Sequence, residues 1–281
     1  MMVKEFDRRW IFLSIGLVVL IFLRVPLKLK YKLSPQTLGF YKAVESLPAG
    51  SVFFLSVDYG PGSEAELRPM HEALVYQLMK RNVKIISIAV FDTGPPLADM
   101  VFKKVTADLA REGIHKEYGK DYVNLGYKTG MDVAMAKIGA SIVETYPTDN
   151  FGTPVEKLPM MKDVKNIKQV AMLCSLSAGS PGVREWLQQV QSRYKVRMVT
   201  GVTAVMTPDL YSFMQTGQIE GFLGGLVGAA EYENLLGRPG SGMAGMGVQS
   251  IAHMLIVGFI FIGNVLYIMS IIKAKRAKAK V

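Results

Sequence analysis

A run of 22 residues without a formally charged side chain, residues 251–272, lies close to the carboxyl terminus. About 20 apolar residues cross the hydrocarbon of a bilayer as a helix, and a buried core helix of this length and uniformity is unusual. We therefore expect a transmembrane helix over residues 251–272. His253 lies near one end of it, whereas Asn264 lies deeper, where it either bonds to another helix or is tolerated alone.

A second uncharged apolar run covers residues 10–23. Extended to residue 27, with Arg24 reaching the interface, it is long enough to span a bilayer. The alternative is a cleaved signal peptide. Residues 24–30 offer no small-x-small cleavage pattern, so we expect an uncleaved transmembrane helix over residues 10–27.

The basic excess of the chain is confined to the flanks of these two runs. The chain has 33 Lys and Arg, 23 Asp and Glu, and a formal charge of +10. Twelve of the basic residues and two of the acidic residues flank the runs, which leaves 21 of each sign in residues 33–250. A nucleic-acid binder would carry the excess on its folded domain, so we expect no nucleic acid and predict the lipid bilayer as the partner.

Two spans would place both termini on one side of the membrane. The terminal segments carry eight Lys and Arg, and the segments beside the central domain carry five. The positive-inside rule then predicts cytoplasmic termini and an extracytoplasmic domain in the cell membrane.

Residues 51–236 alternate between apolar runs of strand length and helical patterns. Near-continuous apolar strands are typical of parallel sheets covered on both faces. We therefore predict an α/β fold: a Rossmann-like, mostly parallel, doubly wound sheet of about five strands. The expected strands are 51–57, 83–91, 122–127, 169–176 and 196–205, and the expected helices are 63–81, 96–112, 130–145, 183–194, 208–216 and 219–236.

The local signals divide the chain into seven segments. Ser34 and Pro35 predict the start of a short helix, and Ser63 and Glu66 are spaced as a capping box. The predicted segments are a basic tail 1–9, a span 10–27, a linker with a short helix 28–50, the α/β domain 51–236, a flexible Gly-rich linker 237–250, a span 251–272 and a basic tail 273–281.

Ligands bind at the carboxyl ends of the strands in folds of this kind. The end of the first strand carries Gly60 and Gly62 in a G-x-G-x-x-A pattern. Asp58 and the acidic residues after the turn would repel a pyrophosphate, and Pro61 removes an amide donor. The pattern therefore favours a tight turn over a dinucleotide site.

The end of the fourth strand has the A-x-S-x-G pattern around Ser180, which resembles the nucleophile elbow of some serine hydrolases. Pro181 has no N–H for an oxyanion, and the one histidine downstream, His253, lies in the second span. We expect instead a helix N-cap at Gly179 or Ser180, with Pro181 in the first turn and free amides for a carboxylate or phosphate.

Asp58 and Asp92 would share a metal only if their strands were neighbours, and their spacing matches neither D-x-D nor D-x-S-x-S sites. We expect solvated strand-end carboxylates, with Lys128 either adding a cation to the crevice or balancing them. Cys174 is expected as a buried small hydrophobe. No catalytic residue, metal or cofactor is predicted; the ligand-binding candidates are Asp58, Gly60, Gly62, Ser63, Asp92, Thr93, Tyr127, Lys128, Gly179 and Ser180.

The segment 221–230 is rich in glycine. On a helix, Gly221 with Gly225 and Gly224 with Gly228 would form a smooth strip that allows another backbone to approach closely. Each glycine weakens a helix by about 1 kcal/mol relative to alanine, so the strip needs a contact within the domain or with a partner, and both remain open. These four glycines and Asn264 are the interface candidates.

These features favour a non-catalytic scaffold or binding protein, a subunit of a larger prokaryotic membrane assembly that contains further copies or other membrane proteins. One alternative is a small-molecule sensor that uses a strand-end crevice with Asp58, Asp92, Lys128 and Ser180. A second is a membrane-bound enzyme working from Asp58 and Asp92.

Overall fold

The computed structural model describes residues 8–24 and 32–278. Its described residues fall into two units, one with residues 8–24 and 244–278 and the other with residues 32–243. The predicted segments 1–9, 10–27, 28–50 and 273–281 each lie partly outside the described residues.

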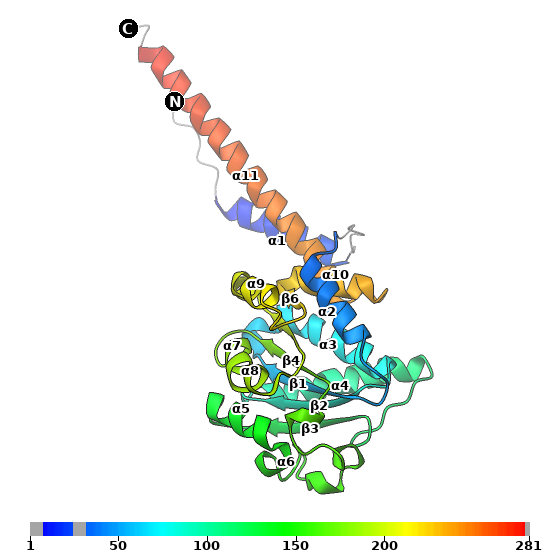
Figure 1. Ribbon diagram of the computed structural model, residues 1–281. Helices are drawn as coiled ribbons and strands as arrows, with labels where there is room; N and C mark the ends of the chain where they lie inside the picture. Colours follow the sequence, from blue (N-terminus) through cyan, green and yellow to red (C-terminus); the bar gives the residue numbers. More distant parts are fainter. Residues whose placement is uncertain (1–7, 25–31, 279–281) are drawn as a thin grey trace. The chain divides into compact units, whose positions relative to one another are not determined.

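Among the described residues, six parallel strands form one sheet in the order β3-β2-β1-β4-β5-β6 (Figure 1). The strand order reverses direction between β1 and β4, as in doubly wound folds. The prediction of an α/β, Rossmann-like parallel sheet is confirmed. The strands are β1 Val52–Asp58, β2 Lys84–Ala89, β3 Tyr122–Tyr127, β4 Met172–Ser177, β5 Met198–Val202 and β6 Phe222–Gly224.

Helices cover both faces of the sheet, which explains why its strands are apolar on both sides. One layer consists of α2 Pro35–Glu45, α3 Glu64–Lys80, α4 Gly94–Arg111 and α10 Gly225–Leu235. The other contains α5 Met131–Ala140, α6 Ile142–Thr145, α7 Val183–Trp186, a π-helical turn Leu187–Gln191, α8 Ser192–Tyr194 and α9 Thr207–Gln215. Along β1, Phe53, Leu55 and Val57 face the first layer, and Phe54, Ser56 and Asp58 face the second.

Ser34 caps α2 with Pro35 in its first turn, as predicted. The capping box of Ser63 and Glu66 is wrong: the Ser63 hydroxyl donates to the Gly60 carbonyl, and the Glu66 carboxylate accepts from the Ala204 amide. The single helix expected over residues 130–145 is interrupted at Ser141, which caps α6.

The single helix expected over residues 219–236 is also wrong, because residues 222–224 form β6 beside β5 and α10 begins at Gly225. A three-residue strand is too short to show a period of two. Gly221 and Gly224 therefore lie outside any helix, and Gly225 adopts a φ of +57°. The glycines do not form the predicted helical strip.

The four glycines pack inside the domain. A Cβ atom on Gly221 would lie 2.0 Å from the Phe40 amide nitrogen, and one on Gly224 would lie 2.5 Å from the Thr207 hydroxyl. A Cβ atom on Gly228 would lie 3.0 Å from the backbone of Leu223. Their small size therefore brings α2, α9 and α10 against β6.

The predicted flexible linker 237–250 is wrong from residue 241 onward, because α11 Ser241–Lys278 is continuous through it. Within the described residues, one helix is long and apolar enough to cross a membrane, Ser241–Lys273, and no residue of its most apolar stretch is buried in the protein. Asn264 donates its side-chain amide to the Ile260 carbonyl of the same helix at 3.0 Å.

The helix α1 Arg8–Arg24 is apolar over Arg9–Phe22 and is shorter than a full membrane span. Residues 25–27 of the predicted first span lie outside the described residues. The described part of the chain thus contains one helix that is long and apolar enough to span a membrane, and the two spans that the sequence predicts are not confirmed.

Replacing Gly221 by alanine should reduce the free energy of unfolding by roughly 2–4 kcal/mol, because the new Cβ must displace backbone atoms of α2. Gly62→Ala is the matched control, since its Cβ would meet open space and should change stability by no more than about 1 kcal/mol. Urea unfolding of the full chain in detergent measures both, and equal effects would contradict the close α2–β6 contact.

Candidate functional site

Asp58 lies at the carboxyl end of β1, where the strand order reverses, and it is fully buried. Its carboxylate accepts hydrogen bonds from the Ser56 hydroxyl at 2.6 Å and the Val90 amide at 3.0 Å. The Trp186 indole N–H at 3.1 Å and the Ser175 hydroxyl at 3.3 Å also donate hydrogen bonds to it. Burial raises the pKa of Asp58 to about 6, although these hydrogen bonds lower it.

The expectation that Asp58 is a solvated carboxylate is therefore wrong. Its side chain points to the sheet face that Trp186 covers, and four donors replace the water it would have in solution. Asp92, in contrast, is exposed and lies beyond the end of β2. No group of three or more His, Cys, Asp or Glu side chains in the described part of the chain could hold a metal ion.

The helix starts at this edge of the sheet are occupied by carboxylates of the chain itself. Glu185 accepts from the Gly182 amide at 2.7 Å and from the Ser180 hydroxyl at 2.6 Å. The Glu66 carboxylate accepts from the Ala204 amide at 2.8 Å. The predicted N-cap at Gly179 or Ser180 is wrong, because α7 begins at Val183 with Gly182 as its N-cap, and the Gly182 amide is not free for an external anion.

Among the other strand-end candidates, the structure shows a contact between Gly60 and Thr93, whereas Lys128 lines a separate pocket with Lys137 and Glu144. Gly60 faces the Thr93 side chain, Thr93 donates to the Tyr59 carbonyl at 3.3 Å, and Gly62 faces open space. Lys128 lies 5.8 Å from the ring centroid of Tyr146, and no ion pair joins it to Asp58 or Asp92 among the described residues. Tyr127 is half exposed at the end of β3.

Sequence reasoning missed Ser56, Ser175 and Trp186, which set the environment of Asp58. Strand alternation places Ser56 and Asp58 on one face, and this signal was present in the sequence. The pairing of Ser56 with Ser175 and of Asp58 with Ser177 requires the register of β1 against β4. Cys174 faces the opposite layer, is fully buried as predicted, and has a pKa raised well above its usual value by that burial.

A second polar region surrounds α10, where two nearly buried glutamates hold the two ends of the domain. Glu231 accepts from both the backbone amide and the hydroxyl of Ser34, just before α2. Glu233 accepts from the amides of Gly240, Gly242 and Met243 at 3.0, 2.9 and 2.8 Å, at the start of α11. The chain therefore enters and leaves this domain beside the same helix.

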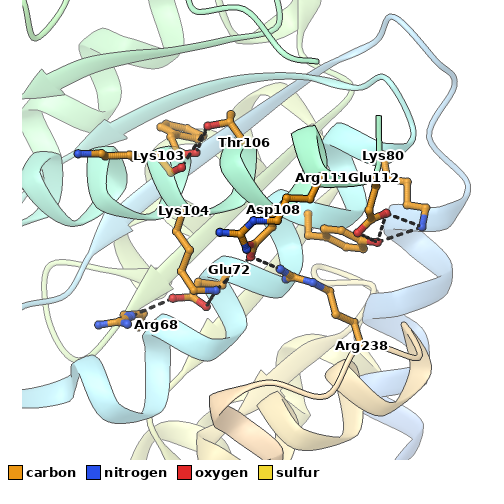
Figure 2. Close-up of polar contacts among 12 residues, drawn as sticks. Arg68, Glu72, Lys80, Lys103, Lys104, Thr106, Asp108, Arg111, Glu112 and Arg238 are labelled. Carbon is orange, nitrogen blue, oxygen red and sulfur yellow. Dashed lines mark hydrogen bonds and ion pairs between the residues drawn. The ribbon is translucent and has the colours of Figure 1, made fainter. Parts of the chain in front are cut away.

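Ion pairs extend from this region across α3 and α4 (Figure 2). Glu72 lies between Arg68 and Lys104, which contact it at 2.9 Å each. Asp108 pairs with Lys104 at 3.3 Å and with Arg238, whose guanidinium also lies 4.3 Å from the ring centroid of Tyr76. These contacts join α3 and α4 to the segment between α10 and α11.

A cavity of about 310 Å³ opens beside this network. Its charged lining consists of Arg68, Glu72, Lys104, Asp108, Glu233 and Arg238, and Ser241 at the start of α11 also lines it. We call it the charged pocket. None of these residues was a candidate from the sequence, because their meeting depends on the packing of three helices.

Comparison with protein-family models, curated proteins and solved structures finds no match to the chain.

The raised pKa of Asp58 predicts a pH-dependent stability. Between the unfolded pKa of 3.8 and the folded value of about 6, the folded chain keeps a proton that the unfolded chain has lost, so stability falls as the pH rises from 4 to 7. Over this pH range, the free energy of unfolding of the wild type should fall by about 3 kcal/mol relative to that of Asp58→Asn.

Urea unfolding at several pH values, followed by Trp186 fluorescence in a Trp10→Phe background, measures this difference. The matched control is Asp92→Asn, which alters an exposed strand-end carboxylate and should run parallel to wild type. Parallel profiles for Asp58→Asn would contradict the buried environment of Asp58.

Replacing Glu233 by alanine removes three hydrogen bonds at the start of α11. We expect a loss of about 1–3 kcal/mol in unfolding free energy and faster protease cleavage between residues 236 and 244. Limited proteolysis with mass spectrometry reads out the cleavage, and Glu156→Ala, at an exposed glutamate, is the control. Unchanged cleavage would show that Glu233 does not stabilise this helix start.

Proposed function

We propose that this protein is a membrane-anchored α/β scaffold or binding protein and a non-catalytic subunit of a larger prokaryotic membrane assembly. This proposal rests on one observation: hydrogen bonds attach both ends of the α/β domain to α10. Glu231 binds Ser34 at the entry, and Glu233 binds the first turn of α11 at the exit. Because both ends of the domain lie beside one helix, the domain is suited to attachment to a single membrane surface through both ends.

The apolar surface of α11 supports membrane anchoring. Its side chains between residues 254 and 272 are largely exposed, including Phe261, Tyr267 and Ile260. Such a surface is stable in lipid or against other helices and is costly in water. We propose residues 10–27 as a second anchor because their apolar run is flanked by basic residues on both sides.

The state of the strand-end edge favours a scaffold over the sensor and enzyme alternatives. Asp58 already accepts four hydrogen bonds within the protein, and Glu185 and Glu66 occupy amides that an anion would use. A ligand at this edge would have to displace contacts that the folded chain already makes.

Membrane fractionation and native mass measurement test the proposal. The full chain should remain in the pellet after alkaline carbonate extraction, and in mild detergent its particle should be heavier than one chain of 31.0 kDa with its detergent. A protein released by carbonate would contradict the anchor. A lone monomer, together with no cross-linked partner in native membranes, would contradict the assembly.

Single-cysteine labelling tests the proposed orientation. In a Cys174→Ala background, an impermeant maleimide should label Lys168→Cys in the domain of intact cells, whereas Lys275→Cys in the tail should react only after lysis. Both positions are exposed in the structure. The reverse pattern would place the domain in the cytoplasm.

A further inference from the structure

We infer that the charged pocket binds a phosphate-bearing group. It lies entirely within the α/β domain, so this inference does not depend on whether the chain spans a membrane. Three cations line it, Arg68 from α3, Lys104 from α4 and Arg238 from the segment before α11. Their positions on separate elements suit an anion with several oxygen atoms better than a single carboxylate.

The formal charges of the six charged lining residues cancel, so exposure decides what a ligand meets first. The Glu72 side chain is only 10% exposed, whereas those of its two partners Arg68 and Lys104 are 37% and 44% exposed. Asp108 is 21% exposed and Arg238 26%, and Glu233 is buried against the start of α11. Arg68 and Lys104 are thus more exposed than the Glu72 carboxylate between them, whereas Arg238 and Asp108 are exposed to a similar degree.

The cations retain hydrogen-bonding capacity for a ligand. Arg68 uses its Nε and one Nη in the pairs with Glu72 and Glu64, and its other terminal nitrogen is not part of either pair. Arg238 likewise donates to Asp108 through one of its terminal nitrogens. Because these guanidinium groups are already oriented by ion pairs with carboxylates of the protein, little side-chain entropy is lost when a phosphate binds.

A membrane lipid headgroup and a soluble phosphate compound both offer this chemistry. Ser241, which lines the pocket, lies ten residues before the apolar run that begins at residue 251. The experiment therefore includes one arm for each source.

The test uses the full chain in a non-ionic maltoside detergent at constant ionic strength. Isothermal titration calorimetry measures binding of inorganic phosphate, of dihexanoyl phosphatidylglycerol and of dihexanoylglycerol, which lacks the headgroup. We expect saturable binding of at least one phosphate-bearing probe and none of dihexanoylglycerol. Tighter binding of the lipid than of phosphate assigns a headgroup, and binding of phosphate that is equal or tighter assigns a soluble compound.

Lys104→Gln should weaken that binding about ten-fold, because it removes a charged hydrogen-bond donor from the pocket. Lys103→Gln is the matched control: it makes the same change on the same helix, at a side chain that points away from Glu72 and Asp108 (Figure 2). Circular dichroism and the unliganded melting temperature check the fold, and Arg68→Gln replaces Lys104→Gln if the latter is misfolded.

Absence of saturable binding by both phosphate-bearing probes would overturn the inference. So would equal weakening by Lys103→Gln and Lys104→Gln, or dihexanoylglycerol binding as tightly as phosphatidylglycerol. None of these results bears on carbonate extraction or on particle mass, so this inference and the proposed function can fail separately.

Discussion

Burial of a carboxylate is tolerated only where protein donors replace the water that it loses, and this constraint organises α10 and its surroundings. Glu231 and Glu233 are separated by two helical positions, which is about 200° around the axis and about 3 Å along it. They therefore point to opposite sides of α10 at nearly the same height. One bonds to Ser34 and the other to the amides that open α11. The two ends of the α/β domain thus depend on the hydrogen bonds of one helix.

The same constraint closes the edge of the sheet where Rossmann-like folds usually hold a ligand. Asp58 occupies the reversal between β1 and β4 and takes donors from β1, from β4, from the loop after β2 and from Trp186. Glu185 and Glu66 saturate nearby amides in the same way. A separate group of charged side chains lines the charged pocket beside α3 and α4, where Arg68 and Lys104 are more exposed than the Glu72 carboxylate between them. The fold therefore separates its buried polar groups, which stabilise it, from the polar groups that are available to a ligand.

The strength of local signals decided how far the sequence could be interpreted. The parallel sheet was predictable because β1, β2 and β4 are continuous apolar runs bounded by turn residues. β6 was not predicted, because three residues are too few to show the alternation of a strand. The glycines in and around it were interpreted as a helical strip instead. The glycine-rich segment after residue 237 indicated a flexible linker, yet its amides donate to the buried carboxylate of Glu233, seven to ten residues earlier, and this stabilises a helix start there. Asp58 was identified as a strand-end residue, but its burial depends on Trp186, 128 positions away.

The sequence by itself determined the alternation of strands and helices, the apolar character of residues 251–272 and the charge balance of the domain, because these follow from local composition and short-range periodicity. Tertiary structure alone decided the order of the strands, the burial of Asp58, the hydrogen bonds of Glu231 and Glu233 at the two ends of the α/β domain, and the assembly of the charged pocket. Most of these require residues far apart in the chain to meet, and all of them depend on burial and hydrogen-bond geometry that no local pattern records.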